Sequence, residues 1–260
     1  MDPVSNKSYH EHEVDPKVFL DVYCSPGIDQ AIYDEITIFP MKTLQKLMSS
    51  GKITGTTLID FSTGPMIGPM LSICDYFTEI IILEANDFSL THAEKWRNGE
   101  EETFDWSHLS DVCSEGDRKK WMKKEETLRR KVKSIMKFDE SKENPIDKSV
   151  FSKASCVTSF YLLSHISKDR EAYSKNIRKL ASMLDIGGHL FLGGTFNVKY
   201  FSIGEHQFHS LPVDEEFIRT VLADGGFSIK LIEKQDSKVV NKAVKYEKVF
   251  LAYAVKVKEV

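Results

Sequence analysis

Short apolar runs alternate with longer amphipathic segments along most of the chain. The runs at 57–61, 79–84 and 154–160 are apolar at most positions, which is typical of strands buried on both faces of a parallel sheet. The segment at 169–184 instead repeats its apolar side chains every three or four residues, which predicts a helix with one buried face. Strands that alternate with such helices predict βαβ units and a mostly parallel sheet.

The rest of the pattern completes a doubly wound α/β fold with helices on both faces of the sheet. Gly187 and Gly188 are expected to close the helix at 169–184. The last two strands have no helix between them, so they should pair as an antiparallel hairpin at the edge. We expect further helices at 15–25, 28–51 (interrupted at Pro40), 66–76, 87–96, 117–136 and 213–222, and further strands at 190–193, 227–231 and 249–255.

The charge balance makes nucleic-acid binding and membrane insertion poor hypotheses. Lys and Arg number 35 and Asp and Glu number 39, so the formal net charge is −4, and generic nucleic-acid binding needs an excess of cations. The basic residues of 117–136 are interleaved with acids and an apolar stripe, which favours a solvated helix face. No apolar run approaches the roughly 20 residues needed to span a bilayer.

Cysteine usage and the N-terminus point to the cytoplasm. The polar, acidic start of the chain resembles neither a signal peptide nor a transit peptide. The four cysteines form no CxxC pair, which indicates free thiols in a reducing compartment. His206 and His209 have HxxH spacing, but no third ligand is evident, so we expect no metal site.

Candidate site residues follow the predicted strands, because ligands of doubly wound sheets bind beyond the carboxyl ends of the strands. A tight loop at 60–65 follows the first strand, and Glu84 ends the second, 20 residues past Gly64. This pair suits a nucleoside, whose ribose hydroxyls would donate to the carboxylate. The chain has neither GxGxxG nor a Walker A loop, so a phosphate-free nucleoside such as S-adenosylmethionine is favoured. Asp139, after the apolar stretch 135–138, could hold an adenine amino group.

The stretch LIDFSTGPMIGPMLSICDYFTEIIILEAND at 58–87, followed by EKW and FDWS, resembles a family of small-molecule methyltransferases. The family contains nicotinamide, phenylethanolamine and indolethylamine N-methyltransferases. The resemblance extends to Asp15-Pro16, Phe19-Leu20 and Tyr23, and to IGE…F…SLP at 203–212. It implies one class I methyltransferase domain over 1–260. That domain would have a seven-stranded, Rossmann-like sheet, an N-terminal arm and helical cap at 1–50, and a cofactor-binding core at 51–260.

The resemblance also implies which positions bind ligands. Glu84 stands at the ribose-binding acid, and Asp139 at the acid beside the adenine. No catalytic residue is implied. The implied cofactor-binding positions are Tyr9, Phe19, Tyr23, Cys24, Ser62, Thr63, Gly64, Gly68, Glu84, Ser89, Asp139, Glu140 and Phe160. The implied substrate-binding positions are Ser164, His165, Gly194, Asn197 and Ser210.

Several of these positions depart from the family pattern. Ser62 replaces a loop glycine, and its Cβ would crowd a cofactor that packs on the backbone. Ser164 and Gly194 stand where relatives keep acids near the substrate, and the adjacent His165 is a candidate hydrogen-bond donor or base. Other departures are Gly68 and Phe19, each for a tyrosine, Cys24 for an arm tyrosine, and Ser89 for an asparagine, with Asn86 as its possible stand-in. Candidates for an aromatic pocket, with core packing as the alternative, are Phe19, Tyr200, Phe201 and Phe208.

The sequence thus predicts an S-adenosylmethionine-dependent N-methyltransferase of a small amine or pyridine. Loss of the acids favours a neutral aromatic acceptor. We expect a cytoplasmic monomer with no nucleic-acid or membrane partner. Two alternatives stay open: a degenerate relative that binds a small molecule without catalysis, and a nucleotide-dependent oxidoreductase. The absence of the dinucleotide glycine pattern speaks against the second.

Overall fold

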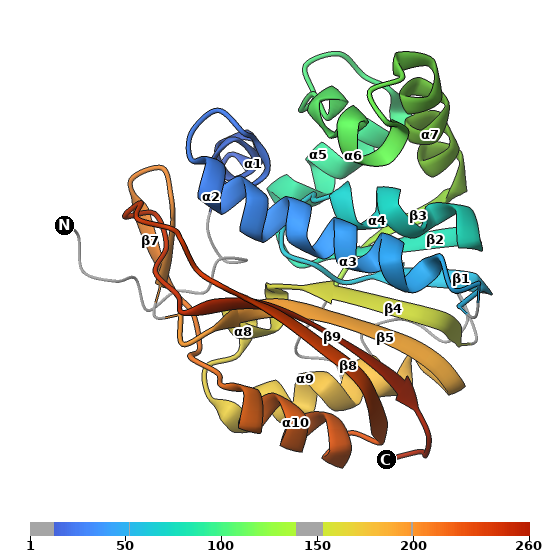
Figure 1. Ribbon diagram of the computed structural model, residues 1–260, viewed down its shortest axis with the longest axis vertical. Helices are drawn as coiled ribbons and strands as arrows, with labels where there is room; N and C mark the ends of the chain where they lie inside the picture. The colour runs from blue at the N-terminus through green and yellow to red at the C-terminus, as the bar shows by residue number, and fades with distance from the viewer. Residues whose placement is uncertain (1–12, 52, 139–152, 199) are drawn as a thin grey trace.

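A seven-stranded sheet runs through the molecule, with helices on both of its faces (Figure 1). The computed structural model describes residues 13–51, 53–138, 153–198 and 200–260. The strands are β1 (Gly55–Asp60), β2 (Phe77–Glu84), β3 (Val132–Lys137), β4 (Ala154–Phe160), β5 (Leu184–Phe196), β8 (Phe227–Asp236) and β9 (Lys248–Lys256). Their order is β3-β2-β1-β4-β5-β9-β8, and β9 alone runs in the direction opposite to the other six strands. The predicted fold class, with its C-terminal antiparallel hairpin, is confirmed.

Alternate side chains of each strand enter two separate cores. Leu58 and Ile80 pack on one face of the sheet and Ile59 and Ile81 on the other, because successive side chains of a strand point to opposite faces. The first face carries α1 (Pro16–Cys24), α3 (Phe39–Met48), α4 (Gly68–Ile73), α5 (Asp87–Asn98) and α7 (Arg118–Lys131). The second carries α8 (Leu162–Ile166), α9 (Arg170–Ser182) and α10 (Glu215–Asp224), as Figure 1 shows for the last two. Burial on both sides explains the nearly continuous apolar runs in sequence.

Several element boundaries differ from the prediction, and two of these differences have a clear physical reason. The helix expected at 117–136 ends at Lys131, because Val132 is already extended and pairs with β2. Gly187 and Gly188 do not close a helix: α9 ends at Ser182, and the glycines lie within β5, where the register against β4 shifts. Short helical turns fill connections at η3 (Cys74–Tyr76), η4 (Ser107–Leu109) and α6 (Ser110–Ser114). No helix in the described ranges is long and apolar enough to cross a membrane.

The N-terminal helical segment continues through Pro40. Helix α2 (Gln30–Ile32), the π-helical turn η2 (Tyr33–Ile38) and α3 follow one another directly, so the predicted interruption is a change of helix type. Pro40 has no N–H, which deprives the carbonyl of Ile36 of its α-helical donor. The hydroxyl of Tyr161 donates to that carbonyl at 2.8 Å instead. Burial raises the pKa of Tyr161 well above its usual value, so the phenol stays a donor.

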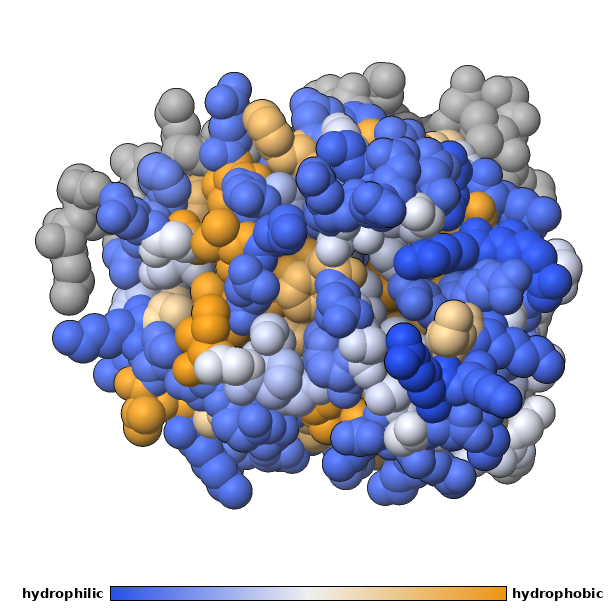
Figure 2. Space-filling view, turned by 90° about the horizontal axis from the view of Figure 1, so that it is seen from above, coloured by the Kyte–Doolittle hydropathy of each residue, from blue (hydrophilic) through white to orange (hydrophobic). Residues whose placement is uncertain are grey.

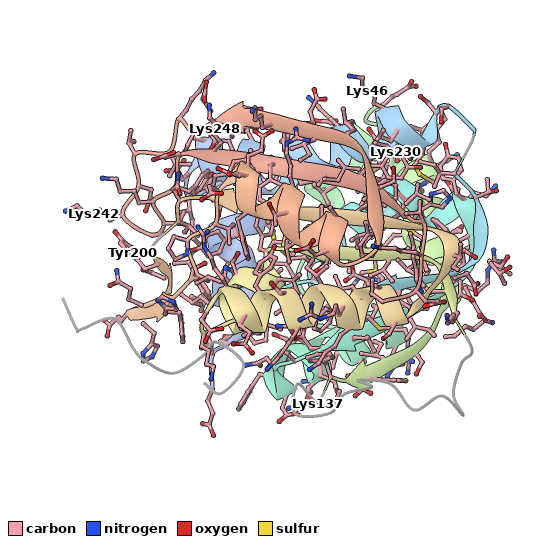
Figure 3. The ribbon with its side chains drawn as sticks, turned by 90° about the horizontal axis from the view of Figure 1, so that it is seen from below. Lys46, Lys137, Tyr200, Lys230, Lys242 and Lys248 are labelled. Atoms are coloured by element: carbon pink, nitrogen blue, oxygen red, sulfur yellow. The ribbon has the colours of Figure 1, made fainter. Side chains whose placement is uncertain are left out.

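A two-stranded hairpin, β6 (Tyr200–Ile203) and β7 (His206–His209), lies outside the main sheet. Tyr23 of α1 fastens it: the Tyr23 hydroxyl donates to the carbonyl of Ser202 at 2.9 Å and accepts from the Ser202 N–H at 3.2 Å. The 237–247 loop joins the same cluster, because Val244 forms a β-bridge with Phe201. In Figure 3, Tyr200 and Lys242 lie at one end of the molecule, away from Lys46 and Lys230.

The surface seen in Figure 2 is mostly hydrophilic, and the apolar residues that reach it gather toward one side. Some of the basic side chains of α7 pair with acids. Lys124 pairs with Asp75, and Arg129 pairs with Glu125 at 2.7 Å. Trp121 and Leu128 of the same helix are buried in the core. The predicted combination of a solvated face and an apolar stripe is therefore present.

Phe160 and Gly193 are matched in size across neighbouring strands. They are register partners in β4 and β5. A Cβ on Gly193 would lie 2.3 Å from a carbon of the Phe160 ring. The glycine therefore makes room for a ring that is itself fully buried.

We expect Gly193→Ala to lower the free energy of unfolding by about 1–3 kcal/mol, because it overpacks the core. Phe160→Val alone should also destabilise the protein, because it leaves a cavity, but the double variant should lose less than the sum of the two single losses, because the smaller side chain clears the space for the new Cβ. Urea denaturation of the single and double variants measures both effects. Gly27→Ala is the control, since its new Cβ would meet its nearest neighbour, Ser25 Oγ, only at 3.7 Å. Wild-type stability of Gly193→Ala would contradict this account of the pair.

Candidate active site

Two buried carboxyl groups end the neighbouring strands β1 and β2. Asp60 is 3% exposed and Glu84 is 1% exposed. Asp60 accepts hydrogen bonds from the hydroxyls of Thr158 at 2.6 Å and Ser62 at 2.9 Å. Burial raises the pKa of Asp60 to about 6, although these two hydrogen bonds oppose the shift. Asp60 is thus held by protein donors, which marks it as a structural acid.

Glu84 is held by backbone N–H groups instead of hydroxyls. Its Oε1 accepts from the N–H of Asn86 at 3.0 Å, and the N–H of Ala85 also stabilises the charge. Burial nevertheless raises the pKa of Glu84 to about 8, with a smaller contribution from the charge of Asp60. A carboxylate has about four acceptor positions, so Glu84 keeps capacity for hydroxyl donors of a ligand. This buried acid fits the ribose of a nucleoside cofactor.

The loop after β1 is tied to β4. The Ser62 hydroxyl donates to Asp60 and accepts from the N–H of Phe160 at 3.0 Å. The N–H of Thr63 donates to the carbonyl of Phe160, also at 3.0 Å. Gly64 then turns the chain with a φ of +64°, a conformation that favours glycine. These bonds direct the Ser62 hydroxyl toward β4; that its Cβ crowds the cofactor stays a prediction.

A small apolar cavity lies where α1, β6, the 237–247 loop and the carboxyl ends of β4 and β5 meet. Its lining residues are Phe19, Tyr23, Ile36, Tyr161, His165, Thr195, Val198, Phe201 and Val244. None of these is a carboxylate or an ammonium group. The space open to the centre of a water-sized sphere is about 30 Å³, so a ring-sized ligand enters only if part of this wall moves. We call this space the apolar cavity.

His165 links the cavity to the loop after β1. Its Nδ1 lies 3.0 Å from Oγ1 of Thr63, and its ring stacks on Phe201 with centroids 3.9 Å apart. The side chain is partly exposed, yet burial lowers its pKa to about 3. The imidazole is therefore neutral at physiological pH. This low pKa disfavours the predicted role of His165 as a base near neutral pH. Its other predicted role, as a hydrogen-bond donor, stays a prediction.

The residues expected from the N-terminal arm divide into two groups. Phe19 and Tyr23 line the cavity and pack together, with ring centroids 5.1 Å apart. Cys24 is fully buried instead, and burial raises its pKa to about 12, so its thiol is unreactive. Tyr9, together with Asp139 and Glu140, lies outside the described residues.

Several other expected positions lie apart from the cavity. A Cβ on Gly194 would meet the ring of Phe250 at 2.9 Å, and Gly68 begins α4, where its Cβ would approach Met41 at 3.1 Å. Asn197 adopts a φ of +56° and donates to Glu247 at 2.7 Å.

Three expected serines are buried. The Ser164 carbonyl accepts from the N–H of Leu211 at 2.8 Å. The Ser210 hydroxyl is fully buried and has no hydrogen-bond partner among the described residues. The N–H of Ser89 is capped by Asn86, whose Oδ1 accepts it at 3.1 Å at the start of α5. Asn86 thus lies just after β2 and next to Ser89, where it could take the place of the family asparagine that Ser89 replaces.

The sequence-based prediction missed five residues of the cavity wall. Phe19 and Phe201 were expected there, whereas Phe208 packs behind Phe201 in the core. Tyr161 had a usable signal, because it directly follows a predicted strand at the edge where ligands bind. The missed wall residues are Ile36, Tyr161, Thr195, Val198 and Val244.

Comparison with known proteins identifies the family. A family model described as the NNMT/PNMT/TEMT family matches residues 2–257. The chain belongs to this family. Nicotinamide N-methyltransferase of Homo sapiens is 33% identical over 231 residues, which cover 88% of this chain and 87% of that protein. Indolethylamine N-methyltransferase of Mus musculus is 31% identical over 222 residues, covering 85% and 84%.

Solved structures share the fold at low sequence identity. An S-adenosylmethionine-dependent methyltransferase from Clostridium acetobutylicum ATCC 824 has a TM-score of 0.59 at 12% identity, covering 93% of this chain and 99% of that chain. Magnesium protoporphyrin IX methyltransferase from Synechocystis PCC 6803, solved with bound SAH, has a TM-score of 0.56 at 15% identity, covering 92% and 93%. The class I methyltransferase fold is confirmed. Family membership also confirms the predicted activity class, S-adenosylmethionine-dependent N-methylation.

We expect Glu84→Gln to stabilise the ligand-free protein while weakening the cofactor. The native carboxyl keeps its proton up to a pH of about 8, whereas an unfolded glutamate ionises near its ordinary pKa of about 4.3. Stability therefore falls as pH rises between these two values. The variant escapes this loss, so at pH 8 its free energy of unfolding should exceed that of the wild type by about 2–4 kcal/mol, with little difference at pH 4.

At pH 9, where the wild-type carboxyl is ionised, affinity for S-adenosylmethionine should fall by about 10- to 100-fold in the same variant, because hydrogen bonds to a charged acceptor are lost. Urea denaturation at both pH values and calorimetric titration measure the two effects. Glu101→Gln, at an exposed loop position, is the matched control. Unchanged cofactor affinity in Glu84→Gln would show that Glu84 makes no contact with the ribose.

Proposed function

We propose that this methyltransferase acts on the ring nitrogen of an uncharged heteroaromatic acceptor of the pyridine class. The observation that carries the proposal is the apolar cavity, whose lining includes Phe19, Tyr23 and Phe201 but no acid. A nicotinamide N-methyltransferase among the relatives supports the same acceptor class.

Charge explains the preference for such an acceptor. An alkylamine is mostly protonated at neutral pH, with a pKa near that of lysine, about 10.4. It must lose a proton before its nitrogen has a free lone pair, and its ammonium form needs a partner when buried. His165, with a pKa of about 3, is too weak a base to take that proton. A pyridine nitrogen needs no base.

The aromatic wall suits the change of charge during transfer. The ring nitrogen becomes cationic when it gains the methyl group, and the faces of Phe19, Tyr23 and Phe201 can stabilise a cation that lies against them. The same rings can hold an alkylammonium ion, but that ion lacks the lone pair that reacts. The rings thus favour the methylated form of a neutral acceptor.

The cofactor would be held by Glu84 at its ribose and by the turn at Thr63 and Gly64. When bound, S-adenosylmethionine supplies an electrophilic methyl group. The protein then has to orient the acceptor and exclude water, and such positioning is worth up to about 7–11 kcal/mol in well-oriented reactions. Helix α1, the β6–β7 hairpin and the 237–247 loop close the cavity, so they are the parts that would open for the acceptor.

We also infer a cytoplasmic monomer that folds as one domain, with a cap at 1–50 and a core at 51–260. All four cysteines are free, which supports a reducing compartment. The net charge of −4 and the ion pairs of Lys124 and Arg129 in α7 support the absence of a nucleic-acid partner. A binding protein without catalysis is not favoured, because the relatives carry the names of enzymes.

We expect the wild-type protein to methylate nicotinamide or quinoline with a kcat/KM at least about 10-fold higher than for tryptamine or phenylethanolamine at pH 7.5. The reason is that well under 1% of an amine with a pKa near 10 carries a free lone pair at this pH. Formation of S-adenosylhomocysteine measures the rates. Thr195→Asp, which places a carboxylate in the cavity wall, should shift the ratio toward the amines. Faster methylation of the amines by the wild type would overturn the proposed acceptor class.

A further inference from the structure

The hydrogen bond between Thr63 and His165 decides which imidazole nitrogen carries the proton. The Thr63 side chain is fully buried, and Nδ1 of His165 is the one hydrogen-bond partner of its hydroxyl among the described residues. If the hydroxyl donates to Nδ1, its proton is satisfied. If Nδ1–H donated instead, the buried hydroxyl proton would have no acceptor, which is costly. The neutral imidazole therefore accepts at Nδ1 and carries its proton on Nε2.

The Nε2–H of His165 is left for a ligand. In the described part of the chain, the one hydrogen bond of the His165 ring is that of Nδ1 with Thr63, and His165 is one of the residues that line the apolar cavity. The stack on Phe201, with an interplanar angle of 20°, fixes the plane of the ring. A rigid, neutral donor in a mostly apolar wall selects strongly among ligands, because an unmatched polar group is left unpaired.

We propose that His165 is a specificity-determining residue whose Nε2–H donates to a hydrogen-bond-accepting substituent, such as a carbonyl, on the heteroaromatic acceptor. This inference rests on the proposed function and narrows its substrate class. Thr63, which orients the His165 ring through its hydroxyl, belongs to the loop after β1. The same loop would also contact the cofactor. The loop thus sets the direction of the acceptor substituent relative to the methyl group.

The test compares two ligands that differ at the substituent. The wild type should bind 3-acetylpyridine more tightly than 3-ethylpyridine, as measured by calorimetric titration. His165→Leu should reduce this ratio of affinities by about 5- to 10-fold, the effect of one neutral hydrogen bond. His165→Gln, which can place an amide donor near the same point, should recover part of the ratio. His209→Leu, at an exposed position outside the cavity, is the control.

A second measurement reads the tautomer directly and needs no turnover. Two-bond 1H–15N correlation spectra should show the His165 proton on Nε2 and no titration between pH 5 and pH 8. Thr63→Val removes the donor to Nδ1, so the population with a proton on Nδ1 should rise. A wild-type proton on Nδ1 would overturn the assignment, because Nε2 would then be an acceptor.

The two proposals fail in different ways. Methylation of both pyridines, with an affinity ratio that His165→Leu leaves unchanged, would end the role of His165 and keep the proposed function. Carbonyl-selective binding that His165→Leu abolishes, without methylation of either ligand, would end the proposed function and keep the role of His165. Thermal denaturation of each variant confirms that the comparison is made on folded protein.

Discussion

The pairing of β1 with β4 at their carboxyl ends is the constraint on which the site depends. Ser62 and Thr63 bond to the backbone of Phe160 beyond the regular ladder between these strands. This extension holds the loop after β1 flat against β4. Glu84 lies at the end of β2, which pairs with the other edge of β1, and His165 of α8 contacts the loop through Thr63. The proposed nucleoside site and the proposed acceptor site therefore meet at the same loop, which these hydrogen bonds hold against β4.

Burial of Asp60 and Glu84 near this loop lowers the stability of the folded protein when the two groups are ionised. Asp60 and Glu84 are both nearly inaccessible, and both have raised pKa values because their charged forms lose water. Asp60 regains part of the loss from two hydroxyls. Glu84 regains less, which is consistent with a group whose remaining partners come from a ligand. The buried Glu84 carboxyl can therefore form with a bound ligand the hydrogen bonds that it lacks in the ligand-free protein.

The fold could be predicted from the sequence because its strands and helices have distinct periodicities. Buried runs such as 79–84 have no polar face, and segments such as 169–184 have one. The errors lie where local preference and strand pairing compete: Val132 continues a charged helical pattern but pairs with β2, and Gly187 looks like a helix end but lies in β5.

The site could be predicted only at the ends of strands. Glu84 and the loop at 62–64 follow strands directly, so their meeting place comes from topology. The cavity wall joins Ile36, Phe201 and Val244, which are far apart in sequence and meet through tertiary packing. Nothing local in the sequence marks Val244 for this place. The hydrogen bond of Thr63 with His165 likewise spans 102 positions, and only the folded chain brings the two side chains together.

The bond between Tyr161 and the carbonyl that Pro40 leaves free has a mechanical consequence. Tyr161 adopts a left-handed backbone conformation with a φ of +65° at the tip of β4, while its phenol is anchored in the N-terminal helix. The Tyr161 side chain thus connects the N-terminal helical segment with the wall of the apolar cavity, which it also lines. A shift of the helical segment at 30–48 would therefore also displace this part of the cavity wall.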